Sequence, residues 1–512
     1  MRVSARDDGF EPQPAGLWLL LLLQIGLVLV WVGVEVAMLA QREMYRHILV
    51  SDVRVIETAR LLFGCTASLI GGVLADRVMS PLKVLIAGLM LALLGTGTMF
   101  LSGRSPALLV GGMVVATVGS WLAQPCLLAQ LGELYRQGDP RRDSGFTWLE
   151  VAVHGARVIG FPVLFLTSGG VEATEGGLAV VVVLLLLLLI AVAVGHRALP
   201  AVGYVAGDED APRAQLGRRD GLQVGACVVV VGLATLGLGL LLVAARVLDL
   251  SAEGSVRTMR PLMLVFTIVL GVVIVVSGRP TRAAAGRPLQ RVEGERLLVL
   301  LPLLLVVLVS VVESQARSAW EGALLTSGST MAQFSTVSSA VWLGAGVALA
   351  LLWRRLDGSS RRPSGVVKMA LGALCVGLAA AVFVGVGAPG GEGAVGIATV
   401  SAALGAVGLM LVLPIGRAMV TKLAPPRQLA TCLGAWGTLP LVVSALMTVH
   451  LDGVAAMVDA RRAVGGRFAL ALLVGGVALL RGLPVLRRGM HGAEEPPAAR
   501  ETGFVYRGNL GA

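Results

Sequence analysis

Apolar runs long enough to cross a lipid bilayer recur along the whole chain, and they strongly limit what it can fold into. A transmembrane helix needs about 20 consecutive, mostly apolar residues. Such runs lie at 17–40, 55–75, 83–101, 107–132, 145–168 and 176–199, then at 222–247 and 260–278, and finally at 297–320, 333–353, 366–388, 394–416, 429–450 and 467–486. The pattern predicts an all-α polytopic membrane protein with about fourteen spans.

The overall composition supports helices that face lipid. Hydrophobic residues make up 56% of the 512 residues and charged residues only 14%, whereas soluble domains carry roughly 25% charged residues. The chain contains 67 glycines, and glycine allows helices to approach closely in membranes. The net charge of +11 comes from basic residues in short loops, which is typical of membrane topology, so we predict a lipid bilayer as partner and no nucleic acid.

The distribution of lysine and arginine predicts the orientation. Basic residues are concentrated in alternate loops and in the tail, whereas the loops near 169–175 and 389–393 carry none. By the positive-inside rule we predict that both termini are cytoplasmic, in a plasma membrane. The segments near 41–54 and 451–466 break this pattern, because both carry arginine on the predicted outer side.

The order of the runs predicts two six-helix halves joined through an extra central pair of helices. Many secondary transporters have two halves that enclose a site at the middle of the membrane. The predicted units are a cytoplasmic N-terminus (1–16), an N-terminal bundle (17–199), linkers with two extra helices (200–296), a C-terminal bundle (297–486) and a cytoplasmic tail (487–512).

Three loop motifs carry a family resemblance. The loop after the second span reads GGVLADR at 71–77, with Gly72, Asp76 and Arg77, and it resembles the loop motif of the major facilitator superfamily. The segments GELY at 132–135 and DPRRDSGF at 139–146 resemble the signature loop of its proton-dependent oligopeptide transporters, and the segments PIG at 414–416 and MVTKLAP at 419–425 resemble another loop of that family. We predict a cytoplasmic gate that contains Gly72, Asp76, Arg77, Arg141, Arg142, Asp143 and Lys422.

This resemblance implies a major facilitator fold, with two six-helix bundles plus the central pair. It also implies proton-coupled uptake of di- and tripeptides, or of a related small solute, by alternating access. The partner would be a small-molecule substrate, a short peptide by resemblance, bound by a monomer. A proton gradient would be the driving force, with no cofactor, no metal and no enzymatic activity.

The family's working residues are only partly matched. Glu35 occupies the first-helix motif, and Glu313 lies one residue before the family's coupling glutamate on the seventh core helix. Gln124 stands in place of a fourth-helix lysine, and Leu409 replaces a tenth-helix glutamate that is implied to hold the peptide amino terminus. Trp436 matches a pocket tryptophan.

The chain has intramembrane charges of its own. Glu150, His154 and Arg157 follow one another at steps of four and three, so they share one helical face, and Glu313 and Arg317 are four apart. A charge at mid-bilayer costs roughly 2.5–3.5 kcal/mol. These groups either neutralise one another structurally or form a relocated proton or substrate site. The candidates for proton coupling are Glu35, Glu313, His154 and Glu150, and those for the substrate pocket are Gln124, Arg157, Arg317 and Trp436.

Two alternatives to peptide transport stay open. One is a transporter whose substrate has changed. The other is a non-transporting descendant that acts as a membrane sensor or scaffold and keeps the loop motifs for folding. No phosphate-binding loop, metal-ligand spacing or nucleophile elbow points to another chemistry.

Overall fold

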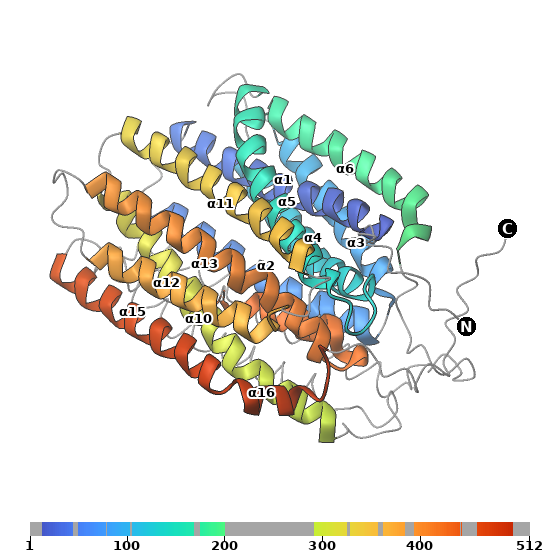
Figure 1. Ribbon diagram of the computed structural model, residues 1–512. Helices are drawn as coiled ribbons and strands as arrows, with labels where there is room; N and C mark the ends of the chain where they lie inside the picture. Colours follow the sequence, from blue (N-terminus) through green and yellow to red (C-terminus); the bar gives the residue numbers. More distant parts are fainter. Residues whose placement is uncertain are drawn as a thin grey trace, which may run out of the picture.

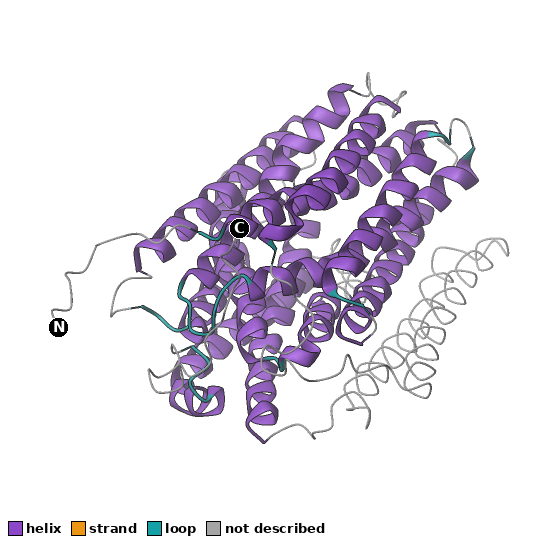
Figure 2. Ribbon diagram, turned by 90° about the vertical axis from the view of Figure 1, so that its right-hand side faces the viewer, coloured by secondary structure: helices purple, strands orange, loops and turns teal. Residues whose placement is uncertain are grey.

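The computed structural model describes residues 13–44, 50–77, 79–102, 105–167, 175–199, 291–324, 328–356, 362–384, 394–440, 442 and 458–494. Helices make up nearly all of these ranges, and no strand occurs in them (Figure 2). The predicted central pair at 222–247 and 260–278 lies outside the described residues. The first helices are α1 (Ala15–Met44), α2 (Val50–Arg77), α3 (Pro81–Phe100), α4 (Pro106–Glu133), α5 (Arg141–Thr167), α6 (Glu175–Gly195) and η1 (His196–Ala198). The later ones are α10 (Arg291–Leu324), α11 (Gly328–Leu356), α12 (Gly365–Val384), α13 (Ala394–Leu423), η2 (Pro426–Gln428), α15 (Val458–Arg481) and α16 (Leu483–Met490), with a further helical segment at 429–440.

The helices confirm a multi-pass membrane protein. Among the described residues, eight helices are long and apolar enough to cross a membrane, namely α1, α3, α4, α6, α10, α12, α13 and α15. Each predicted span outside 200–290 coincides with a helix or with the segment 429–440. On α6, the large apolar side chains Leu187, Ile190 and Val194 are more than half exposed. Such a surface is suited to lipid.

The described helices pack as two groups. In the first half α3 packs on α4 and α6, α2 on α4, and α1 on α5; in the second half α12 packs on α13 and α15, and α10 on α13. Figure 1 shows these groups as blue-to-green and yellow-to-red helices that run roughly parallel to one another. Small residues allow this packing: a β-carbon at Gly95 would collide with the backbone of Ala116 on α4.

The two halves meet along two seams. In one seam, α5 packs against α11 and α13. In the other, α2 lies against the segment 429–440, where a β-carbon on Gly72 would overlap the backbone of Ala430, and one on Gly434 would approach the Ser68 carbonyl oxygen at 2.8 Å. Gly72 therefore permits backbone contact between the halves at the position where the loop motif predicts a gate.

Candidate functional site

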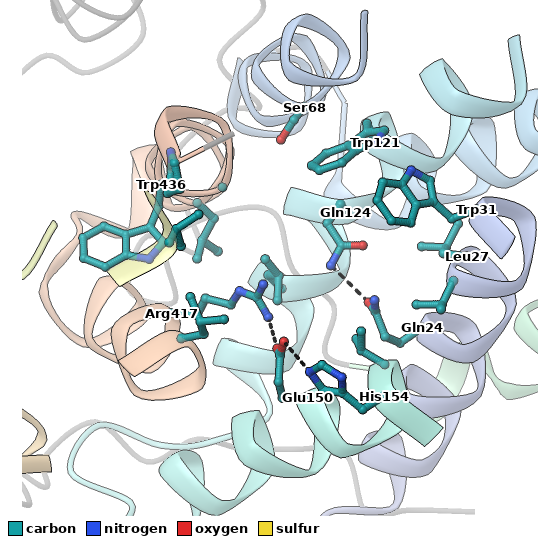
Figure 3. A pocket seen from close by; sticks show the side chains of 18 of the residues that line it. Gln24, Leu27, Trp31, Ser68, Trp121, Gln124, Glu150, His154, Arg417 and Trp436 are labelled. Atoms are coloured by element: carbon teal, nitrogen blue, oxygen red, sulfur yellow. Dashed lines mark hydrogen bonds and ion pairs between the residues drawn. The ribbon is translucent and has the colours of Figure 1, made fainter. Parts of the chain in front are cut away.

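A cavity of about 360 Å³ lies between the halves, within the size range of small-molecule sites. Its walls come from α1, α2, α4 and α5 on one side and from α10, α11, α13 and 429–440 on the other. Figure 3 shows Glu150 and His154 on the first half facing Arg417 and Trp436 on the second. A solute bound here would contact both halves at once.

Charged groups cross the cavity between the halves. The carboxylate of Glu150 on α5 accepts a hydrogen bond from the guanidinium of Arg417 on α13. Its other oxygen lies 3.8 Å from Nε2 of His154, and the His154 ring stacks on Trp342 of α11 with centroids 4.3 Å apart. Glu150 thus binds the guanidinium of Arg417 on the second half and lies beside the His154 imidazole on its own helix.

Aromatic, aliphatic, hydroxyl and amide side chains form most of the rest of the wall. Trp31, Trp121 and Trp436 line it together with Trp342. The side-chain amide of Gln124 donates to Oε1 of Gln24 at 3.1 Å, which joins α4 to α1. The cavity therefore offers flat apolar surfaces with a small number of polar groups, as ligand sites commonly do.

A buried ionic cluster joins the halves where α5 begins. We call it the Asp143 cluster; it consists of Asp143, Lys368, Lys422 and Glu494. The Asp143 carboxylate accepts from Nζ of Lys368 at 2.5 Å and from Nζ of Lys422 at 2.7 Å. Lys422 also lies 3.3 Å from Glu494, and Lys368 Nζ sits 4.3 Å from the ring centroid of Trp353. The Lys368 side chain is 1% exposed, so its charge is compensated entirely by neighbours.

The ionisation of Asp143 follows from these contacts. Asp143 lies in the first turn of α5, before the apolar span begins at 145. Burial raises the pKa of its carboxyl group, but the charges and hydrogen bonds of Lys368 and Lys422 outweigh burial and hold the pKa below its ordinary value of 3.8. Asp143 is therefore an anion throughout the range of about pH 5 to 8 in which histidine titrates.

Two further contacts close the same end of the bundle. Arg142 donates from Nη1 to the Thr421 carbonyl oxygen on α13 at 3.1 Å. Asp76, at the end of α2, accepts the backbone N–H groups of Ala430 at 3.1 Å and Thr431 at 2.6 Å. These amides open the helical segment 429–440, so the Asp76 carboxylate caps a helix of the opposite half.

We expect Asp76→Asn to slow transport by about twofold to fivefold while the protein still folds. Asparagine keeps one acceptor for the helix amides but loses the charge that favours a helix N-terminus, a loss worth about 0.3–1 kcal/mol. Initial uptake rates in liposomes measure the effect. Asp139→Asn is the matched control, because Asp139 pairs with Arg141 in its own loop, at 2.8 Å. Equal rates in wild type and Asp76→Asn would remove Asp76 from the gate.

The structure brings some predicted residues together and separates others. Gln124, Arg157 and Trp436 line the cavity with Glu150 and His154. Two of the predicted gate residues, Asp143 and Lys422, are direct partners.

The remaining predicted residues lie elsewhere. Glu313 and Arg317 are absent from the cavity lining; they pair with each other at 3.1 Å, and Arg317 packs on Gly405 of α13. Glu35 is absent from the lining too. Arg141 contacts its own loop, and the Arg77 side chain lies outside the described residues.

Three residues of these clusters, Arg417, Lys368 and Glu494, were not predicted from the sequence as site residues. Arg417 was assigned to the loop after 416, but α13 continues to Leu423 and keeps Arg417 on the cavity wall. Lys368 belongs to the apolar run 366–388. A lone lysine in such a run requires a buried partner, and this was the available signal.

Comparisons with known proteins find transporters that are similar to this chain. No family model matches the chain. The "Uncharacterized transporter YclF" of Bacillus subtilis (strain 168) is 24% identical over 441 residues, which cover 83% of this chain and 84% of the relative. The dipeptide and tripeptide permease A of Cronobacter turicensis is 32% identical over 94 residues, which are 18% of each chain.

Solved structures establish the fold. A POT family transporter in complex with a thioalcohol-conjugated peptide matches with a TM-score of 0.65 and 19% identity, over 93% of this chain and 99% of that one. A mutant of the peptide transporter POT in complex with alafosfalin matches with a TM-score of 0.60 and 22% identity, over 94% and 97%. The chain therefore has the major facilitator fold of the POT transporters, as the loop motifs predicted.

Proposed function

We propose that this chain is a secondary active transporter that takes up short peptides, or a related small solute, together with protons by alternating access. The observation that carries the proposal is a cavity enclosed by both halves beside an end held shut by contacts between the halves. Rocking of the halves about the cavity would break the Asp143 cluster and open that end. The peptide-bound and permease relatives support the choice of substrate.

The proton must bind elsewhere than at Asp143, which stays ionised. Among the candidates Glu35, Glu313, His154 and Glu150, we place the coupling proton on Glu313. This carboxylate is 2% exposed. Its Oε1 accepts from Arg317, whereas Oε2 has no hydrogen-bond partner among the described residues. A buried carboxylate oxygen without a donor is a suitable place for a proton that binds in one state and leaves in the other.

The same proposal gives the setting. The protein would act as a monomer in the bacterial inner membrane, with both termini in the cytoplasm and the Asp143 cluster at the cytoplasmic end. The proton gradient would supply the driving force, and no cofactor would be required.

Uptake of a labelled dipeptide into liposomes, with and without an inward proton gradient, tests the proposal. We expect accumulation that needs the gradient and falls at least tenfold in Glu313→Gln. Glu295→Gln, at a partly exposed position of α10 beside Arg291 and His491, is the control and should resemble wild type. If neither a dipeptide nor another small solute moves while a known peptide transporter is active alongside, the transport proposal is wrong. If Glu313→Gln still accumulates the dipeptide as wild type does, the coupling proton does not bind at Glu313.

A further inference from the structure

The charges that line the cavity are unequal in number. Its wall, within the part of the chain that the structure describes, contains the guanidinium groups of Arg157 and Arg417 but a single carboxylate, Glu150. Glu150 is 4% exposed and is engaged by Arg417 and approached by His154. The carboxylate is therefore committed to the protein, and the site has a surplus of positive charge.

Arg157 is the group that supplies this surplus. It lies on α5 one turn beyond His154, and its side chain is exposed at the cavity wall. Its guanidinium carbon lies 4.9 Å from the ring centroid of Trp31 on α1. Stacking of this kind holds a guanidinium in place while its N–H groups stay available to an anion.

The walls around Arg157 suit an apolar body. Trp31, Trp121, Trp342 and Trp436 surround the space, and Leu409 of α13 adds an aliphatic surface. An ammonium group placed here would meet two guanidinium groups, and the one carboxylate would have to leave Arg417 to receive it. Such a site favours a ligand that carries negative charge alone.

We propose that this cavity selects small organic anions with an apolar or aromatic body, that Arg157 binds the anionic group, and that a free ammonium group on the ligand is not needed and weakens binding. This inference rests on the proposed function, because it names the substrate class of the same cavity. It narrows the short peptides or related solutes of that proposal to anionic compounds such as N-acylated peptides or aromatic acids.

Binding to the purified protein tests this with three probes that share one skeleton. They are N-acetyl-phenylalanyl-alanine, which carries only a carboxylate; phenylalanyl-alanine, a zwitterion; and phenylalanyl-alanine amide, which carries only an ammonium group. Thermal unfolding at increasing probe concentration gives an apparent affinity for each. We expect the acetylated probe to bind at least tenfold more tightly than the amide, with the zwitterion between them.

Two variants locate the recognition. Arg157→Gln is expected to lower the apparent affinity for the acetylated probe at least tenfold and to leave the affinity for the amide within about twofold of wild type. Arg136→Gln, at an exposed loop position, should change neither affinity. The inference is overturned if the amide binds as well as the acetylated probe, if no probe shifts the unfolding, or if Arg157→Gln keeps the wild-type ranking.

The two proposals fail in different ways. Tight binding of the acetylated probe without any flux in liposomes would preserve the anion site and disprove transport. Gradient-driven uptake of the free dipeptide, combined with equal binding of all three probes, would preserve transport and disprove the anion site.

Discussion

Asp143→Asn is expected to reduce gradient-driven uptake at least tenfold and to shift the protein toward the state in which the end at the Asp143 cluster is open. The substitution leaves Lys368 and Lys422 buried without their shared carboxylate, since their side chains are 1% and 6% exposed. Breaking a buried pair by removing one partner costs about 3–5 kcal/mol. If that cost falls mainly on the closed state, its population relative to the open state drops by about a hundredfold or more.

The controls for this variant use charge and pH. Asp139→Asn removes a carboxylate that pairs within its own loop, so its uptake should stay within about twofold of wild type.

The folded pKa of Asp143 lies below its ordinary value of 3.8. Its ion pairs therefore contribute fully to stability above pH 3.8, and this contribution is lost only as the pH falls through the lower pKa of the folded protein. Wild-type contacts at this end should persist at pH 5; uptake by Asp143→Asn at the wild-type rate would contradict the gate.

Glu150 and Arg417 are expected to behave as one unit in binding and stability. Glu150→Gln leaves the Arg417 guanidinium on the cavity wall without its partner, so we expect both a lower unfolding temperature and uptake at least tenfold below wild type. The double variant Glu150→Gln, Arg417→Gln should recover stability relative to the single variants, because no unpaired charge is left, but not uptake. A coupling free energy of about 0.5–3 kcal/mol follows for groups in direct contact.

The His154 pair provides the internal standard for this cycle. His154 lies 3.8 Å from the same carboxylate, beyond hydrogen-bond distance, and is expected to couple to Glu150 more weakly than Arg417 does. Unfolding temperatures and uptake rates of the four members of each cycle give both values. If Glu150 couples equally to Arg417 and His154, or does not couple to Arg417, the ion pair between the halves has no role in holding the halves together.

The fold was predictable because it depends on local properties. Apolar runs of sufficient length predicted each described span, and the glycines predicted close packing of helices such as α3 and α4. The end of α13 was predicted too early, at 416, because a hydropathy criterion stops at the first charge. In the folded protein Arg417 can stay in the helix, since Glu150 lies across the cavity.

The pairing of the charges was only partly predictable. The contacts of Glu150 with His154 and of Glu313 with Arg317 follow helical spacing, and both occur. Asp143 and Lys368 are separated by 225 residues, and no periodicity relates them. The same limit applies to the cavity, because residues such as Trp31 and Trp342 come to line one cavity only through the packing of the two halves.

The distance between the halves at the closed end tests the central claim most directly. Spin labels would be placed at two exposed positions, Gln137→Cys in the loop before α5 and Arg355→Cys in the last turn of α11. Their separation would be measured by double electron–electron resonance after replacement of the five native cysteines. A pair within one half, Met79→Cys and Gln137→Cys, is the reference. We expect two distances for the first pair, with Asp143→Asn favouring the longer one, and one unchanged distance for the reference pair. A single, unchanged distance for the first pair in wild type and in Asp143→Asn would contradict alternating access through this end.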